Sequence, residues 1–205
     1  MVDRVLLGLY SLLKLRRSAM QVEEYRAVEA AETFHPTCPV HLVSSINDPS
    51  VIEELKAANP DLVVVLGTEI IRDPVLAAAP RFVNLHAGIT PLYRGSHGQF
   101  WAVMNDDLEQ VGVTLHVVDR GIDTGPILGQ ARFDFNSDRD NFLTLAAKSS
   151  VHGAELLVEW IERHQGDFQN TLTIPPPAGK SRLYYSPGLR DHRRFEQLIH
   201  DRKAA

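Results

Sequence analysis

The stretch DLVVVLG, residues 61–67, predicts the fold class of this chain. Its five consecutive aliphatic residues show no alternation of apolar and polar positions, which is typical of a parallel strand covered on both faces. A helical pattern, VIEELKAAN (51–59), precedes it, and a second strand pattern, FVNLH (82–86), follows a short helix predicted over 73–79. Strands that alternate with helices at this spacing predict an α/β fold with a mostly parallel sheet and helices on both faces.

The same alternation continues on either side of this stretch. The first 34 residues have a mainly helical pattern, although Arg4–Gly8 could instead form a strand. The other predicted elements are strands over PVHLV (39–43), VGVTLHVVD (111–119) and PILGQARFDF (126–135), and helices over 98–105, 138–164 and the charged C-terminus. We predict one domain over 1–205, made of a helical N-terminal segment (1–38), a core (39–137), a long helix (138–165) and an extended loop with a C-terminal helix (166–205).

Composition narrows the classes of partner and compartment. A formal charge of −5 and a pI near 6.0 predict no nucleic-acid partner, because nucleic-acid-binding domains usually carry a basic face. No apolar run reaches the ~20 residues of a membrane helix. Val5–Leu13 has the length of a signal-peptide core, but its positive charges mostly follow it. The single cysteine, Cys38, excludes an internal disulfide and is predicted to be a buried small residue, so we expect a cytoplasmic protein.

Two polar motifs follow predicted strands. In NLHAGITPLYRG (84–95), Asn84 and His86 are two residues apart, so a strand would present their amide and imidazole on the same face. In GIDTG (121–125), Asp123 lies in a loop after the next long strand pattern. Ligands of α/β sheets bind at the carboxyl ends of strands, which favours a site here. The alternative is a structural polar pair at a strand end and an aspartate that only caps a turn.

Taken together, the two motifs resemble the signature of the folate-dependent formyltransferase family, which includes glycinamide ribonucleotide, methionyl-tRNA and amino-sugar formyltransferases. The resemblance covers roughly residues 39–137 and implies a Rossmann-like fold. The matching residues are Asn84, His86, Pro91, Arg94, Gly95, Gly112, Thr114, Asp123 and Gly125. It implies catalytic roles for Asn84, His86 and Asp123, with 10-formyl-tetrahydrofolate as the formyl donor. It also implies a pterin pocket formed by Gly67, Thr68, Glu69, Ile70, Ile71, Arg72, Asp119, Arg120, Gly121 and Ile122.

The residue types suit formyl transfer on chemical grounds. An amine that attacks a formyl carbon creates a negatively charged oxygen, to which the Asn84 amide and a protonated His86 could donate hydrogen bonds. Asp123 would orient His86 and favour its charged form, and could accept the proton of the amine through a water. This chemistry requires neither a metal nor a covalent nucleophile, and the nine histidines show no metal-ligand spacing.

Other residues near the motifs have two readings each. Arg94 could bind an anionic group of a small-molecule amine acceptor or tie its loop down, and His97 could face the acceptor or only begin a helix. His116 shares a face with Thr114, and we predict a structural hydrogen bond for it rather than a site role. Trp101 is predicted to be a core residue.

The chain also departs from the family pattern. Gly88 stands where the family has Ser, and the 38 residues before PVHLV lack the Gly-rich turn with which family members begin. A late start, a fragment or a differently built acceptor site would each explain this abbreviation. A sheet shortened in this way would expose an edge, so a homodimer is expected.

The abbreviation also bears on the acceptor. It disfavours glycinamide ribonucleotide, and a length of 205 residues disfavours methionyl-tRNA, whose enzymes carry an extra C-terminal domain. An amino sugar attached to a nucleotide is the favoured acceptor. A formyl-tetrahydrofolate hydrolase and a catalytically silent folate-binding module remain alternative functions.

Overall fold

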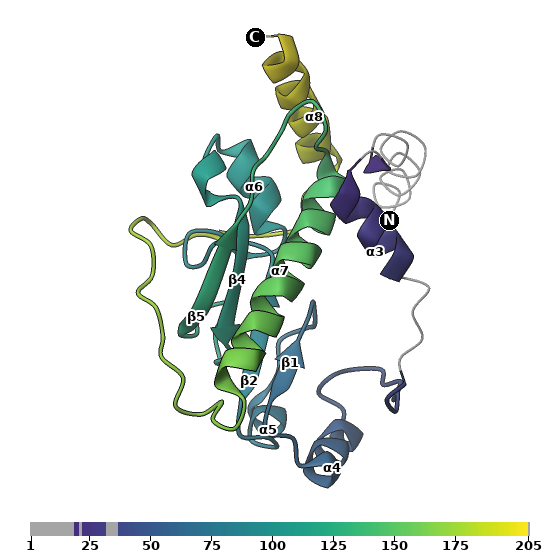
Figure 1. Ribbon diagram of the computed structural model, residues 1–205, viewed down its shortest axis with the longest axis vertical. Helices are drawn as coiled ribbons and strands as arrows, with labels where there is room; N and C mark the ends of the chain where they lie inside the picture. Colours follow the sequence, from purple (N-terminus) through teal and green to yellow (C-terminus); the bar gives the residue numbers. More distant parts are fainter. Residues whose placement is uncertain (1–18, 21, 32–36, 205) are drawn as a thin grey trace.

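The computed structural model describes residues 19–204 except residues 21 and 32–36 (Figure 1). The helix or strand alternatives for Arg4–Gly8 and the signal-peptide interpretation of Val5–Leu13 lie outside the described residues. The described elements are α3 (Glu23–Ala31), α4 (Pro49–Ala58), β1 (Val63–Val65), α5 (Asp73–Leu76), β2 (Phe82–His86), β3 (Arg94–Gly95), α6 (Gly98–Met104), the 3-10 turn η2 (Leu108–Gln110), β4 (Gly112–Val117), β5 (Ile127–Arg132), α7 (Phe142–His164), β6 (Leu183–Tyr184) and α8 (Leu189–Ala204).

The central sheet has four strands in the order β1-β2-β4-β5. The β1–β2 pair is parallel, whereas the β2–β4 and β4–β5 pairs are antiparallel. The α/β class is confirmed, but the expectation of a mostly parallel sheet is wrong for these strands. The segment between β2 and β4, with α6 and η2, does not cross a sheet face: His86 at the end of β2 lies opposite Thr114 near the start of β4. The short loop from β4 to β5 likewise suits only an antiparallel pair.

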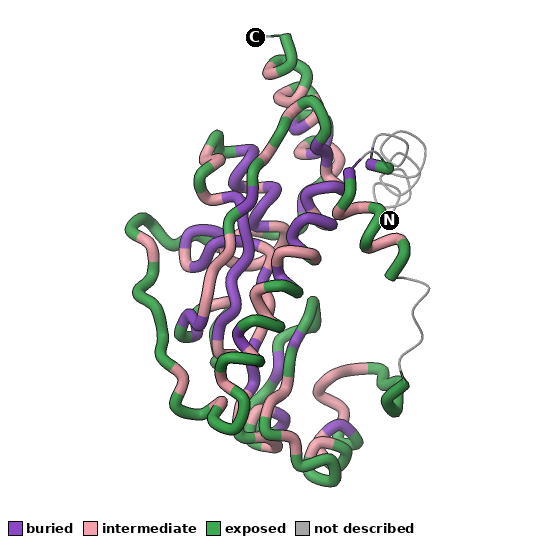
Figure 2. Tube along the Cα trace, viewed as in Figure 1, coloured by how far each residue is buried: buried purple, intermediate pink, exposed green. Residues whose placement is uncertain are grey.

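Helices pack on both faces of this sheet, as predicted. Val83 of β2 and Leu115 of β4 are fully buried in a cluster with Trp160 of α7, the long helix that crosses one face (Figure 1). Phe82 points to the opposite face and packs in a cluster with Val51 of α4 and with α5. Figure 2 shows the buried residues concentrated along the inner strands and the adjoining turns of α6 and α7.

The largest core cluster joins four elements around Phe100 of α6. Val113 of β4, Leu145 of α7 and Phe195 of α8 pack in this cluster, and all four side chains are almost completely buried. The start of α7 is fixed by a capping box, in which Asn141 accepts from the N–H groups of Leu143 and Thr144. Because Phe195 and Phe100 belong to the same cluster, the core holds the C-terminal helix α8 against α6.

Two local predictions are wrong. The segment PVHLV (39–43) forms no strand and is exposed: the exposed fraction of Leu42 is 96%. It has no partner strand among the described residues, and β1 stays an edge of the sheet. Cys38 is exposed rather than buried, because the segment around it does not enter the core.

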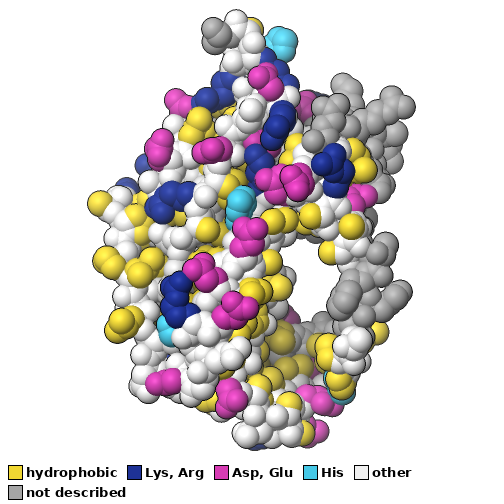
Figure 3. Space-filling view, in the orientation of Figure 1, with side chains coloured by type: hydrophobic (Ala, Val, Ile, Leu, Met, Phe, Trp, Pro, Cys, Tyr) yellow, Lys and Arg dark blue, Asp and Glu magenta, His cyan; other side chains and the backbone are white. Residues whose placement is uncertain are grey.

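Figure 3 shows acidic and basic side chains interspersed over one face of the molecule. Of the helices described, none is long and apolar enough to span a membrane.

Candidate active site

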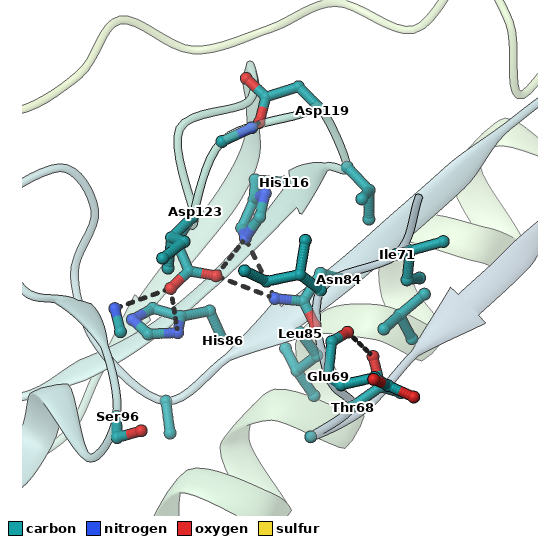
Figure 4. Close-up of a pocket in the computed structure, with 18 of the residues that line it drawn as sticks. Thr68, Glu69, Ile71, Asn84, Leu85, His86, Ser96, His116, Asp119 and Asp123 are labelled. Atoms are coloured by element: carbon teal, nitrogen blue, oxygen red, sulfur yellow. Dashed lines mark hydrogen bonds and ion pairs between the residues drawn. The ribbon is translucent and has the colours of Figure 1, made fainter. Parts of the chain in front are cut away.

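The three predicted catalytic residues come together at the ends of β2 and β4 (Figure 4). Asn84 and His86 lie on the same face of β2, and Asp123 lies in the loop that follows β4. A fourth residue, His116 of β4, is directly opposite Asn84 in the antiparallel register. Opposite residues of an antiparallel pair have neighbouring side chains, so β4 adds a second imidazole to the group.

Asp123 is the centre of this group. Its Oδ2 accepts a hydrogen bond from the Gly95 N–H at 2.7 Å and lies 3.4 Å from His86 Nδ1. Its Oδ1 accepts from Asn84 Nδ2 at 3.3 Å and lies 3.4 Å from His116 Nε2. The backbone of Asp123 is left-handed, with φ of 51°, which Asp tolerates better than most residues. The Asp119 carboxylate holds this turn by accepting from the Gly121 N–H at 3.0 Å.

Carbonyl contacts determine which ring nitrogens carry protons. His86 Nε2 lies 2.7 Å from the Tyr93 carbonyl oxygen and must donate to it, which leaves Nδ1 facing Asp123. His116 Nδ1 donates in the same way to the Val117 carbonyl at 2.9 Å, so its Nε2 can accept from Asn84 Nδ2 at 3.1 Å. Both Nδ2 hydrogens of Asn84 and the Nε2 hydrogen of His86 are therefore engaged within the protein, and would have to change partner to reach a substrate oxygen.

Burial and the neighbouring groups have opposite effects on the pKa of His86 and on that of Asp123. Burial lowers the pKa of His86 below its usual value, and the opposing effects of Asp123 and the Tyr93 carbonyl are smaller. The two groups that face its ring nitrogens, Asp123 and the Tyr93 carbonyl, favour the charged form against this effect. Burial raises the pKa of Asp123. His116, His86 and the Gly95 N–H together lower it by more than burial raises it, so the pKa lies below its usual value. These neighbours therefore favour the carboxylate form of Asp123 beside the His86 ring.

A cavity of about 470 Å³ opens beside this group. Arg72 and Arg120 do not line it; Arg120 instead forms an ion pair with Asp73 at 2.8 Å. The cavity is lined by eight of the ten predicted pterin-pocket residues, namely Gly67, Thr68, Glu69, Ile70, Ile71, Asp119, Gly121 and Ile122. Ile71, Leu85 and Val118 give it apolar walls, and the polar group around Asp123 closes one end. This combination fits a flat heterocycle with a polar edge.

One residue that the sequence interpretation missed holds the wall formed by residues 67–72. The Asn47 side chain donates to the Ile70 carbonyl at 2.9 Å and accepts from the Arg72 N–H at 2.8 Å. Ser45 also donates to the Glu69 carboxylate. Two backbone groups of this wall are thus already bonded within the protein and do not face a ligand. Residues 45–50, SINDPS, have only the composition of a turn, so the sequence carries no signal for this role of Asn47.

A family model described as formyl transferase matches residues 19–161, more than half of this chain. The chain belongs to the formyl transferase family. Methionyl-tRNA formyltransferase of Thermodesulfovibrio yellowstonii is 34% identical over 179 residues, which cover 86% of this chain and 54% of that protein. This chain spans about half the length of the curated relatives it matches.

Solved structures of the family share the fold. Formyltransferase PseJ from Anoxybacillus kamchatkensis, solved in complex with UDP-4,6-dideoxy-4-formamido-L-AltNAc and tetrahydrofolate, has a TM-score of 0.53 and 21% identity, with 88% of each chain covered. Glycinamide ribonucleotide transformylase 1 from Symbiobacterium toebii has a TM-score of 0.50 and 30% identity, with 55% of this chain and 53% of that chain covered. The Rossmann-like fold expected of this family member is confirmed.

The two predicted acceptor residues of this formyl transferase family member differ in position. Arg94 donates to the Ile122 carbonyl at 2.9 Å and to the Ser181 hydroxyl at 3.0 Å, and does not line the cavity. These contacts favour the alternative in which Arg94 stabilises its loop rather than binding an acceptor. His97 lines the cavity at the start of α6, with a left-handed backbone at φ of 56°. His97 therefore faces the same space as the candidate catalytic group.

His116 was expected to be structural, but it lines the cavity and contacts two of the three catalytic candidates. The alternating pattern of VGVTLHVVD did place it on one face with Thr114. Thr114 itself donates to the Gly88 carbonyl at 2.7 Å and accepts from the Thr90 N–H at 3.1 Å. The alternating pattern could not indicate which strand pairs with β4, and only the antiparallel pairing with β2 places His116 opposite Asn84.

The Gly88 position, where other family members have Ser, has no space for a side chain in this structure. A Cβ there would lie 2.6 Å from the Tyr93 carbonyl oxygen, 2.7 Å from His86 Nε2 and 2.9 Å from the Gly98 Cα. We expect Gly88→Ala to displace His86 and to cost about 1–3 kcal/mol in the free energy of unfolding, as overpacking does. Urea denaturation measures this cost. Gly188→Ala is the control, because the Gly188 φ is not positive and a Cβ there would meet only an ordinary contact, Asp191 Oδ2 at 3.7 Å; an equal loss in both variants would exclude the steric explanation.

The buried histidines predict how stability depends on pH. Burial lowers the pKa of His86, His97 and His192 from an ordinary value of 6.5. The unfolded chain then binds more protons than the folded protein below about pH 6.5, so the free energy of unfolding should decrease as pH falls from 7 towards 5.5. Urea denaturation across this range measures the slope. His192→Phe should reduce the slope, and His200→Gln, at an exposed position, should not; a flat profile in the unmodified protein would contradict the prediction.

Proposed function

We propose that this protein transfers a formyl group from 10-formyl-tetrahydrofolate to an amine. The observation that carries the proposal is the meeting of Asn84, His86 and Asp123 at one end of a cavity whose walls match the predicted pterin pocket. Family membership supports the reaction class, and a relative of the same fold has been solved with tetrahydrofolate. In this proposal the cavity holds the pterin ring, and the Asp123 group faces the formyl carbon.

The residues would act in the following way. As the amine nitrogen bonds to the formyl carbon, Asn84 Nδ2 and His86 Nε2 release their protein acceptors and donate to the formyl oxygen. One such donor is typically worth about 10²–10³ in rate. Asp123, kept ionised by its neighbours, accepts the proton lost by the amine through a water and stabilises the imidazolium form of His86. The oxyanion then collapses: the bond between the formyl carbon and the donor nitrogen breaks, and the proton taken up by Asp123 passes through the water to that nitrogen, which leaves a formamide and tetrahydrofolate.

For the acceptor we propose an amino sugar attached to a nucleotide. PseJ, whose fold this chain shares, was solved with a UDP-linked formamido sugar. Methionyl-tRNA is a second candidate, because the curated relatives at 34–35% identity carry the name methionyl-tRNA formyltransferase. Parallel assays with nucleotide-linked 4-amino-4,6-dideoxy sugars and with methionyl-tRNA would separate the two acceptors by the formylated product.

Binding of the stable analogue 5-formyl-tetrahydrofolate, measured by calorimetry, tests the folate site first. Saturable micromolar binding is expected, and no binding at millimolar ligand would overturn the proposal. Single-turnover assays with 10-formyl-tetrahydrofolate then separate the alternatives. Formate released without any amine would indicate a hydrolase, and binding without turnover on any amine tested would indicate a silent module.

A further inference from the structure

The C-terminal segment of residues 181–185 lies against the loop that contacts the candidate catalytic residues. Strand β6 pairs in parallel with β3, so Leu183 lies opposite Arg94. The Arg94 N–H donates to the Arg182 carbonyl at 3.0 Å, and the Ser96 N–H donates to the Tyr184 carbonyl at 3.0 Å. The backbone of residues 94–96 is therefore fixed along one edge by residues 181–185, called the tail below.

The other edge of the same short strand faces the candidate catalytic group. Successive N–H groups of an extended segment point in opposite directions. Between the two groups that bond to the tail, the Gly95 N–H points the other way and donates to Asp123 Oδ2 at 2.7 Å. One residue before β3, the Tyr93 carbonyl accepts from His86 Nε2 at 2.7 Å. Two of the contacts that orient His86 and Asp123 thus come from a backbone segment held by the tail.

The Tyr184 side chain adds a second connection. Its ring stacks on the Tyr93 ring, with centroids 5.3 Å apart, and on the Trp101 ring, with centroids 5.4 Å apart. Its hydroxyl accepts from Asn105 Nδ2 at 2.8 Å. Gly95 has no room for a Cβ because the Tyr184 carbonyl lies against it. Tyr184 therefore contacts Tyr93, Gly95 and Ser96 while remaining outside the cavity that we assign to folate.

We propose that Tyr184 is a positioning residue, which holds the 93–96 backbone so that the Tyr93 carbonyl and the Gly95 N–H orient His86 and Asp123. This inference rests on the proposed function for the roles of His86 and Asp123. The ring stack is the part that a side-chain substitution removes, since the β3–β6 backbone bonds survive it. Loss of the stack would let the 93–96 segment shift, and a shift of about 1 Å at a catalytic group can cost about 10²-fold in rate.

Tyr184→Ala tests the proposal with two NMR signals that do not depend on turnover. In the unmodified protein, the His86 Nε2 proton and the Gly95 amide proton should both give downfield resonances typical of short hydrogen bonds. In Tyr184→Ala both resonances should move or broaden, while 5-formyl-tetrahydrofolate still binds with the same Kd. In single-turnover assays the rate should fall about 10- to 100-fold with an unchanged KM for the donor.

Two variants serve as controls. Tyr184→Phe keeps the ring stack and should retain both resonances and the rate. Tyr185→Ala removes a neighbouring side chain that is 75% exposed and should behave like the unmodified protein. Unchanged His86 and Gly95 resonances in a folded Tyr184→Ala protein would overturn the positioning role. If the resonances respond but the unmodified protein transfers no formyl group, the positioning contact stands and the proposed function fails.

Discussion

Asp123→Asn should lower the rate of formyl transfer by at least about 10²-fold, with folate binding retained. The substitution keeps the shape of the side chain and is tolerated at the left-handed φ of 51°. An amide oxygen can still accept from the Gly95 N–H. What it removes is the negative charge, which in our proposal stabilises protonated His86 and accepts the proton of the amine. The loss should therefore appear in kcat rather than in the Kd of 5-formyl-tetrahydrofolate.

His86→Ala is the companion measurement and should cause a loss of similar size. If the two residues act as a unit, the double variant should lose little more than either single variant, because residues that act together are strongly non-additive. Arg120→Gln, in the same loop but outside the cavity and in an exposed ion pair with Asp73, is the control for loop disturbance. A loss of only two- or threefold in both single variants would remove the catalytic assignment.

The largest expected effect on stability concerns a buried ion pair at the start of α7. Lys148 Nζ lies 2.8 Å from Asp140 Oδ2, and the exposed fractions of the two side chains are 8% and 0%. The Lys148 ammonium also donates to the Asp134 carbonyl at 3.0 Å. Lys148→Met would leave the Asp140 carboxylate buried without its counter-charge, which typically costs about 3–5 kcal/mol in the free energy of unfolding. Urea denaturation measures this cost.

Further variants separate the buried charge from the loss of packing. Lys148→Met combined with Asp140→Asn should recover most of the stability, since neither charge remains and the amide can still accept from the Asn136 N–H. Glu159→Ala breaks an exposed ion pair with Arg163 on the same helix and should change stability little. A Lys148→Met protein as stable as the unmodified one would show that the pair contributes nothing measurable.

The order of helices and strands could be predicted from the sequence to a large extent. A continuous apolar run marked β1, the pattern FVNLH marked β2, and the helices predicted over 138–164 and at the charged C-terminus correspond to α7 and α8. The segment PVHLV shows where this fails. Its residues favour a strand, but a strand needs a partner, and among the described residues no strand pairs with 39–43, although β1 is an edge of the sheet. Local preference was present there without the long-range pairing that stabilises it.

The sequence by itself indicated three of the residues that meet in the candidate site, Asn84, His86 and Asp123. Asn84 and His86 share a face because strands have a period of two, and the resemblance to the family signature linked both to Asp123. Only the tertiary structure decided their surroundings: the direction of β4, the position of His116 opposite Asn84, and the contact of Tyr184 with the loop before α6. The reason is physical. Periodicity is a property of neighbours along the chain, whereas these contacts join segments that are 32 to 91 residues apart and depend on how the whole core packs.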